Sequence, residues 1–418
     1  MWKYQCKTHL IALLAAFFLG AFLAFFSLQQ GLDLSAFSYP EEVVDYINNN
    51  KILFYMAGGL SIAGIVNVIF MIYYAGNMYN INPVVLIVIL MFFTQPLMYI
   101  GTLLVIPAII VCIYGIITSR NELRKEYQNA KVSDEEEIFR IYKNTHKLDE
   151  TVKPLALACR NNVIRITAIY ILGVIAVLFV MTLINNLFVL VISLVFYLLA
   201  LNLLLRYRSS SIIPIAALLY ESCDPEACAS AIFYYSQWRG RMKLKQHALL
   251  AQCLIYLDDP QLAQDVLVHF PKKDAASILQ YWSLMAYVYY LLKDESDLQR
   301  CKVQADKVQL NAGKTGVLIQ SEEKRAIQNK IDLMNGELNT SKKYYLHALK
   351  QARFPFQQVD ASYYIGLISF VQEDYSLANM YFNKVIDFGN KMCFVAKAKK
   401  YLELMENMEI DSKEEMMQ

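Results

Sequence analysis

Residues 166–205 read ITAIYILGVIAVLFVMTLINNLFVLVISLVFYLLALNLLL, a run of 40 residues without Asp, Glu, Lys or Arg. As one helix this run would be about 60 Å long, twice the roughly 30 Å hydrocarbon core of a bilayer. It must therefore fold back, and Asn185-Asn186 near its middle marks the turn. The sequence predicts two membrane spans here.

A second charge-free run, Ile52–Ser119, is 68 residues long and needs three passes by the same arithmetic. An earlier apolar segment, Leu10–Leu28, is longer than the core of a signal peptide and precedes no A-x-A cleavage site, so we interpret it as an uncleaved span. About six spans are therefore predicted within a transmembrane domain at 1–207. The three passes of the long run are placed at Ile52–Tyr74, Ile81–Met98 and Gly101–Ser119.

Basic loops indicate the orientation of the spans. The segment between Arg120 and Arg165 carries ten Lys or Arg residues, whereas the loop Gln29–Asn50 carries four acidic residues and no basic one. Because Lys and Arg are enriched in cytoplasmic loops, we place the central loop, about 120–165, and the C-terminal half in the cytoplasm. We expect the membrane to be a bacterial cell membrane.

The central loop has two interpretations. Ser133 and Glu136 have the spacing of a capping box, which predicts a short helix at Glu135–Lys147. Our first interpretation is a solvated connector. The alternative is a segment that docks against the C-terminal half.

The composition excludes an ordinary cytosolic enzyme. Hydrophobic residues make up 56% of the chain and charged residues 18%, whereas soluble domains have about 45–50% and 25%. No charged side chain lies within a predicted span, which disfavours proton pumps and ion-coupled carriers. Small residues from Ala57 to Gly64 would let helices approach closely, either within the bundle or at a dimer face.

After Tyr207 the sequence changes to amphipathic helices separated by turns. The turns begin 35, 35, 42 and 37 residues apart, which is the period of stacked helical hairpins. We predict a helical-repeat domain at 208–410, ended by a capping helix at Lys391–Asn407, and a frayed tail at 411–418. The turns are Cys223–Glu226, Asp258–Gln261, Lys293–Ser296, Asn335–Leu338 and Gln372–Tyr375.

The hairpins around residues 282 and 375 carry a recognisable pattern. Its residues are Trp282, Met285, Ala286 and Tyr289 at W-x2-L-G-x2-Y positions, and Gly366, Tyr375, Ala378 and Phe382 at the glycine, aromatic, alanine and aromatic positions. Through them the segment from Ile212 to Phe388 resembles the tetratricopeptide repeat (TPR) family. The resemblance implies a right-handed superhelix with a concave groove that binds peptides or protein segments. The expected fold class is all-α: a polytopic transmembrane helix bundle followed by a TPR-like α-solenoid.

The resemblance also implies which residues line the groove, since in that family they come from the first helix of each hairpin. Amides and tyrosines at these positions suit an extended peptide, because tyrosine combines apolar area with a hydrogen-bonding tip. The groove candidates are Lys245, Gln252, Gln280, Ser283, Tyr287, Tyr290, Lys330 and Tyr363.

The densest basic cluster follows Trp238 and consists of Arg239, Arg241, Lys243 and Lys245. Each such charge adds about 1 kcal/mol of attraction to an anionic leaflet, so one interpretation is contact with anionic lipid. The other is a solvated turn. The residues after Tyr207 include 25 basic and 25 acidic ones, which leaves no net positive field for nucleic acid.

No motif predicts a catalytic, cofactor or metal site. The five histidines form no HExxH motif, and Cys223 and Cys228 lack the second pair that a zinc site needs. Carboxylates at the turns are expected to cap the following helices. The sequence therefore predicts a membrane-anchored adaptor that binds a protein or peptide partner. The alternative is a membrane enzyme or transport component with its site in the spans and the repeats as a regulatory module.

Overall fold

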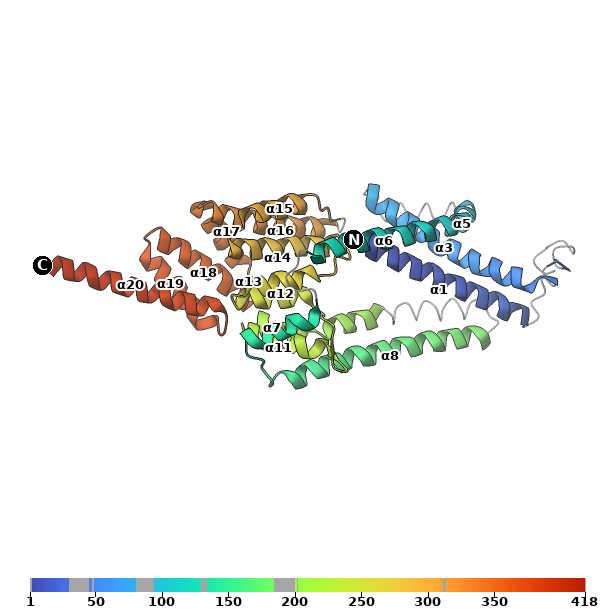
Figure 1. The fold of residues 1–418 in the computed structure, drawn as a ribbon, viewed down its shortest axis with the longest axis horizontal. Coiled ribbons are helices and arrows are strands. Elements are labelled where there is room, and N and C mark those ends of the chain that lie inside the picture. The colour runs from blue at the N-terminus through green and yellow to red at the C-terminus, as the bar shows by residue number, and fades with distance from the viewer. Residues whose placement is uncertain are drawn as a thin grey trace. The chain divides into compact units, whose positions relative to one another are not determined.

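The computed structural model describes residues 2–29, 45–46, 49–79, 94–128, 134–183, 200, 202–310 and 313–417. These residues form two compact units (Figure 1). Apart from one short ribbon, the regular structure in both units is helical, so the predicted all-α fold class is confirmed. The units are built mainly from Met1–Tyr127 and from Gln128–Pro271, Ala276–Gln309 and Leu318–Gln418.

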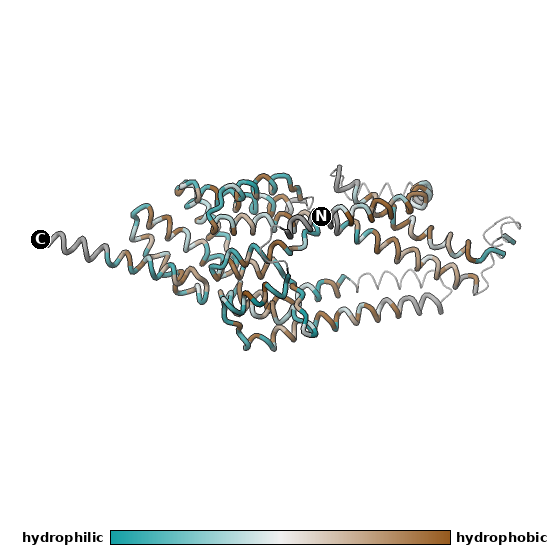
Figure 2. The backbone as a smooth tube through the Cα atoms, viewed as in Figure 1, coloured by the Kyte–Doolittle hydropathy of each residue, from teal (hydrophilic) through white to brown (hydrophobic). Residues whose placement is uncertain are grey.

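The first unit is apolar, and α1 and α3 are hydrophobic along most of their length (Figure 2). Leu13 and Ala16 of α1 form a core with Ala63 of α3 and Val105 of α6. The described helices of this unit are α1 (Trp2–Gln29), α3 (Lys51–Tyr79), α5 (Thr94–Leu103) and α6 (Val105–Gln128).

Three described helices are long and apolar enough to cross a membrane. The segments in α1 and α3 overlap the predicted spans at Leu10–Leu28 and Ile52–Tyr74. The third belongs to α8 (Lys153–Leu183), which begins 13 residues before the charge-free run at Ile166. The turn at Asn185-Asn186 and most of the spans predicted at 81–98 and 186–205 lie outside the described residues. The three segments are Gln5–Phe25, Lys51–Tyr74 and Lys153–Gly173.

The predicted span Gly101–Ser119 is divided between two helices. Helix α5 ends at Leu103, and α6 begins at Val105. Pro107 explains the interruption, since its nitrogen has no proton to donate to the Leu103 carbonyl four residues earlier.

The small residues of α3 are helix-crossing points inside the first unit. A Cβ built on Gly20 of α1 would lie 2.3 Å from the Gly58 carbonyl oxygen, and one on Gly64 would lie 2.8 Å from the Thr102 nitrogen of α5. Backbones in such contact leave no room for a side chain. Packing within the bundle therefore accounts for Gly58 and Gly64.

The second unit includes the central segment, and its short helix is α7 (Glu135–Thr145). The predicted helix is present, but its N-cap is Asp134, whose side chain accepts a hydrogen bond from the Glu136 nitrogen at 3.2 Å. Ser133 lies outside the described residues.

The interpretation of this segment as a solvated connector is wrong. Ile138 and Tyr142, one helical turn apart on α7, are fully buried, and the Tyr142 ring lies 4.7 Å from that of Phe233. His146 at the end of α7 contacts Asp259, with 3.0 Å between Nε2 and Oδ2. The apolar face of a short helix must be covered, and here the first two hairpins cover it.

Five helical hairpins follow, as the spacing of the turns predicts. A two-residue ribbon of β1 (Gln237–Trp238) and β2 (Arg241–Met242) separates the first hairpin from the second. The paired helices are α10 (Ile213–Tyr220) and α11 (Pro225–Ser236), α12 (His247–Tyr256) and α13 (Pro260–Val268), α14 (Ala275–Leu292) and α15 (Glu295–Asp306), α16 (Gly313–Met334) and α17 (Leu338–Gln351), and α18 (Pro355–Val371) and α19 (Tyr375–Phe388).

The five hairpin turns share the same backbone conformation. A single residue adopts a left-handed conformation, with φ between +51° and +77°, directly before the N-cap of the second helix. Its role is to end the first helix in the manner of a Schellman or αL motif. Aspartates then cap four of the second helices, which confirms the predicted role of the turn carboxylates. The left-handed residues are Cys223, Asp258, Lys293, Gly336 and Glu373.

The array closes, since its last elements contact its first hairpin. The Tyr220 ring of α10 stacks on Phe356 of α18 with centroids 4.8 Å apart. Lys391, just before α20 (Cys393–Met417), pairs with Asp224 at 2.9 Å. Repeats in an open solenoid contact only their neighbours. The first helices of these hairpins therefore surround an interior that their own aromatic side chains fill.

Helix α20 covers the end of the array, as predicted for a capping helix. Ala398 and Met405 are buried, and Lys399 and Glu403 are exposed. The described helix continues to Met417 and so includes residues 411–417 of the predicted frayed tail. Lys, Glu and Met are good helix formers, which explains the continuation.

Asn329 of α16 lies six residues before the turn of its hairpin, close to the position that Ala251 and Ala286 occupy, seven residues before the turn, in the second and third hairpins. Asn329 is 2% exposed, and neither its Oδ1 nor its Nδ2 has a hydrogen-bond partner among the described residues.

We expect Asn329→Ala to raise the free energy of unfolding by about 1 kcal/mol, because it removes a desolvated amide. Urea unfolding of the full chain in detergent micelles measures this. The control Asn407→Ala, at an exposed site, should change little; a loss of stability in Asn329→Ala would contradict the assignment.

Candidate functional site

The structure brings four of the eight groove candidates together. Tyr287 and Tyr290 of α14, Lys330 of α16 and Tyr363 of α18 belong to one aromatic cluster. Lys330 and Tyr363 are 7% and 6% exposed, so they face the interior and do not line an open groove. Closure of the array explains this difference from the prediction.

The other four candidates lie apart from that cluster. Lys245 lies 5.0 Å from the Tyr235 ring centroid, and Gln252 accepts a hydrogen bond from the Tyr220 hydroxyl at 3.3 Å. Gln280 is exposed. Ser283 hydrogen-bonds to Glu323.

A cage of tyrosine rings encloses the Lys330 ammonium. Its Nζ lies 3.6 Å from the Tyr287 ring centroid and 4.1 Å from that of Tyr364, and the rings of Tyr290 and Tyr345 lie 5.1 and 5.6 Å away. The same Nζ donates a hydrogen bond to the Tyr345 hydroxyl at 3.0 Å. Cation–π attraction is strongest where the cation is desolvated, so the rings stabilise this buried charge.

A chain of hydroxyls joins the cage to Asp360 of α18. Tyr364 donates to the Tyr287 hydroxyl at 3.1 Å, and Tyr287 donates to Asp360 Oδ1 at 2.8 Å. Burial raises the pKa of Asp360, while the charge of Lys330 and the Tyr287 hydrogen bond oppose the rise. The Asp360 side chain is half-buried and so remains in reach of solvent.

Burial lowers the pKa of Lys330 to about 8, against the opposing charge of Asp360. A lysine with such a pKa can serve as a nucleophile or base where a substrate reaches it. Here four rings surround the ammonium. We therefore assign Lys330 to holding the cage together and not to catalysis.

We name as the acidic edge Tyr344 of α17 and the three carboxylates whose charges act on it: Glu322 and Glu323 of α16 and Asp360 of α18. Burial raises the pKa of Tyr344, and the charges of Asp360, Glu323 and Glu322 raise it further. The pKa of Glu323 is raised by burial and by Glu322, against the Ser283 hydrogen bond. The charges that raise the pKa of Tyr344 are thus all negative, and a cation beside them would be stabilised.

Sequence reasoning missed Asp360, Tyr345, Tyr364 and Glu323. Two signals were present: Glu323 precedes Lys330 by seven residues, two helical turns on the same face, and Tyr364 directly follows the chosen Tyr363. Tyr345 lies on the second helix of its hairpin, whereas the TPR resemblance places groove residues on the first helix.

The predicted membrane-surface residues lie on and beside the β1–β2 ribbon. Arg239 occupies its turn with φ +49°, and the exposed Arg241 lies on β2. Trp238 is 48% exposed and lies near two guanidinium groups, with Cζ of Arg160 and Cζ of Arg239 5.1 and 5.8 Å from its ring centroid. We name as the basic–aromatic cluster Arg160 of α8, Arg208 of the helix at 202–210, Trp238, Lys243 and Lys245.

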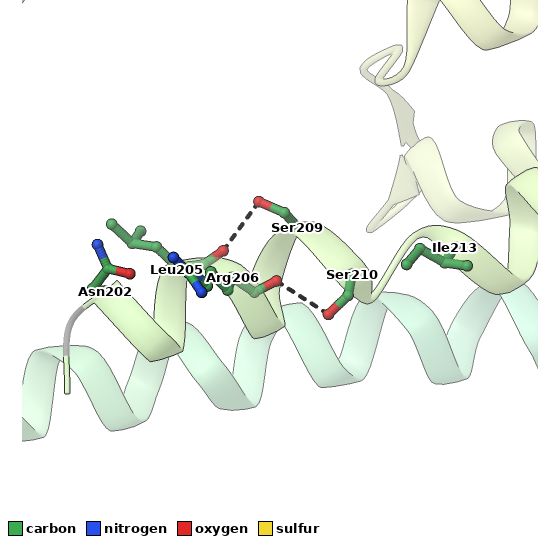
Figure 3. Close-up of a pocket in the computed structure, with 6 residues that line it drawn as sticks. All are labelled: Asn202, Leu205, Arg206, Ser209, Ser210 and Ile213. Atoms are coloured by element: carbon green, nitrogen blue, oxygen red, sulfur yellow. Dashed lines mark hydrogen bonds between the residues drawn. The ribbon is translucent and has the colours of Figure 1, made fainter. Parts of the chain in front are cut away.

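A surface hollow of about 510 Å³ is lined mainly by residues of the helix at 202–210 (Figure 3). Ser209 and Ser210 line it, but their hydroxyls donate to the Leu205 and Arg206 carbonyls at 3.0 and 3.1 Å. Small-molecule sites have polar groups that converge on the ligand. The hollow lacks that arrangement, so we assign it no ligand.

Polar groups also meet inside the first unit. Asn67 of α3 donates to the Gly101 carbonyl at 2.9 Å, and its Oδ1 lies 3.2 Å from His9 Nε2. The His9 ring stacks on Phe70 with centroids 4.4 Å apart. Each polar group is satisfied by a neighbouring helix, so the contacts explain the pair as packing.

Within the described ranges, no group of three or more His, Cys, Asp or Glu side chains could hold a metal ion. Comparison with known proteins gave no match: no family model, curated protein or solved structure matches the chain.

Proposed function

We propose that the chain is a membrane-anchored adaptor whose TPR-like α-solenoid binds a protein segment that carries Lys or Arg. The apolar helices, about six spans in this proposal, hold the solenoid at the cytoplasmic side of a membrane. The acidic edge is the observation that carries the proposal. It replaces the open groove as the partner-binding surface.

The chemistry of this edge supports a basic partner. Glu323 and Asp360 are half-buried carboxylates with raised pKa values, so a cation placed beside them gains charge-assisted hydrogen bonds. The Tyr344 ring belongs to the same edge, and an aromatic ring there can pack against the stem or head of Lys or Arg. The charge of the caged Lys330 already acts on Asp360, whereas the nearby charge that acts on Glu323 is the negative one of Glu322.

A peptide titration tests the proposal. Full-length protein in detergent micelles is titrated with fluorescent 12-residue peptides of basic, neutral and acidic composition, and fluorescence polarisation reports affinity. We expect the basic peptides to bind and Asp360→Asn or Glu323→Gln each to weaken them about tenfold, because a charged hydrogen bond contributes about 1.5 kcal/mol. Added salt should weaken binding further.

The matched control is Asp387→Asn, which removes the same charge from an exposed site on α19. It should leave the affinity unchanged. Equal binding of acidic peptides, or basic peptides unaffected by both edge variants, would contradict the proposal.

A further inference from the structure

The basic–aromatic cluster holds cations close together. Arg160, Lys243 and Arg208 all lower the pKa of Lys245, after the larger effect of burial. The Lys245 ammonium lies over the Tyr235 ring, and the Arg160 side chain packs on Trp238 and donates to the Gln237 carbonyl. Arg160 Nε is buried without a partner among the described residues. One carboxylate lies nearby: Glu135 accepts a hydrogen bond at 2.8 Å from the nitrogen of Leu244, which stands between Lys243 and Lys245. Four basic side chains beside one carboxylate leave an excess of positive charge, which attracts an anion.

The position of the cluster indicates where that anion comes from. Arg160 precedes the charge-free run at Ile166 by six residues, about 9 Å along a helix, and Arg208 follows its end at Leu205 by three residues. The polar layer of a bilayer is about 5–8 Å deep on each side. If the run crosses the membrane, Arg208 therefore lies within this layer, about 4.5 Å past the run, and Arg160 lies at its outer edge. Half-exposed Trp238 is typical of that layer.

The first part of α8 also fixes the cluster to the repeats. Ala156 and Cys159 of α8 are buried, and the Lys153 ammonium lies 5.6 Å from the Tyr234 ring of α11. The helix that leads into the apolar run thus packs against the first hairpin. An anion held by Arg160 and Lys245 would join the helix, the hairpin and the membrane surface.

We propose that the basic–aromatic cluster binds the phosphate of an anionic membrane lipid headgroup. Arg160, Arg208, Lys243 and Lys245 supply the charge, and Trp238 packs at the level of the headgroups. The lipid orients the helical-repeat unit at the membrane surface. This inference does not depend on the peptide partner proposed above.

The experiment measures stabilisation of the full-length protein in neutral detergent micelles. Its melting temperature is followed during titration with dioctanoyl phosphatidylglycerol, dioctanoyl phosphatidylcholine or inorganic phosphate, since a ligand that binds the folded state raises this temperature. We expect a saturable rise with phosphatidylglycerol alone. Each lysine near an anionic surface contributes about fivefold in affinity, so Lys243→Gln/Lys245→Gln should weaken binding about 25-fold.

The matched control is Lys399→Gln/Lys400→Gln, which removes two exposed charges from α20 and should keep wild-type affinity. A second variant, Arg208→Gln, provides an independent loss of about fivefold should the double variant fold poorly. An equal rise with phosphatidylcholine would overturn the proposal, as would equal affinity for inorganic phosphate. Unchanged phosphatidylglycerol affinity in both cluster variants would overturn it too.

Discussion

Replacing Tyr364 with alanine is expected to lower the free energy of unfolding of the helical-repeat unit by about 3–5 kcal/mol, the usual cost of deleting a buried aromatic side chain. Tyr364 is 2% exposed and stacks on Tyr345 with centroids 4.7 Å apart. It also packs against Lys330 and Phe394. Its removal leaves a cavity in the middle of the cage and takes away part of the attraction that holds the buried ammonium.

The measurement is hydrogen exchange by mass spectrometry on the full chain, which reports opening of α14, α16 and α18 separately. Tyr364→Phe is the matched variant, since it removes only the hydroxyl that donates to Tyr287 at 3.1 Å. It should cost about 1 kcal/mol. Similar exchange rates in Tyr364→Ala and the native chain would show that the cage is not a core.

Gly20→Ala is expected to separate α1 from α3 and to destabilise the apolar unit by about 3 kcal/mol, as overpacking at a closed contact does. Its Cβ would lie 2.3 Å from the oxygen and 2.9 Å from the carbonyl carbon of Gly58. Both atoms belong to backbone, so no side-chain rotation relieves the overlap. The two helices must move apart and lose the contacts that small residues allow.

The temperature at which half of the detergent-solubilised protein remains monodisperse in size-exclusion chromatography measures this effect. Ala15→Leu adds a larger group to the exposed face of the same helix and should change the temperature little. Equal behaviour of the two variants would contradict the close approach of α1 and α3.

The repeat pattern could be predicted because each turn contains residues that end one helix and cap the next. Asp224, Asp259 and Asp374 are followed by helices that they cap, and the left-handed residue before each of them ends the previous helix. The candidate spans in α1 and α3 could also be predicted from local sequence, because the lack of charged residues shows which segments avoid water.

Closure of the array was not predictable from period and pattern. It depends on contacts between residues far apart in sequence, such as Tyr220 with Phe356 and Lys391 with Asp224. A family geometry that assumes an open groove therefore placed Lys330 and Tyr363 on a surface, although they are buried. Docking of α7 was predicted only as the alternative, because charges of both signs surround its two buried residues, Ile138 and Tyr142, in the sequence.

Photo-crosslinking at the acidic edge shows whether a basic protein segment binds there. A photoreactive residue replaces Tyr344 in the full-length protein, and a second protein carries it at Phe388, which is 61% exposed on α19. We predict that a basic peptide crosslinks at position 344 and that excess unlabelled peptide prevents this. At a peptide concentration below saturation, Asp360→Asn should reduce the crosslinking, in line with about tenfold weaker binding. Crosslinking only at position 388, or equally at both positions, would contradict the account.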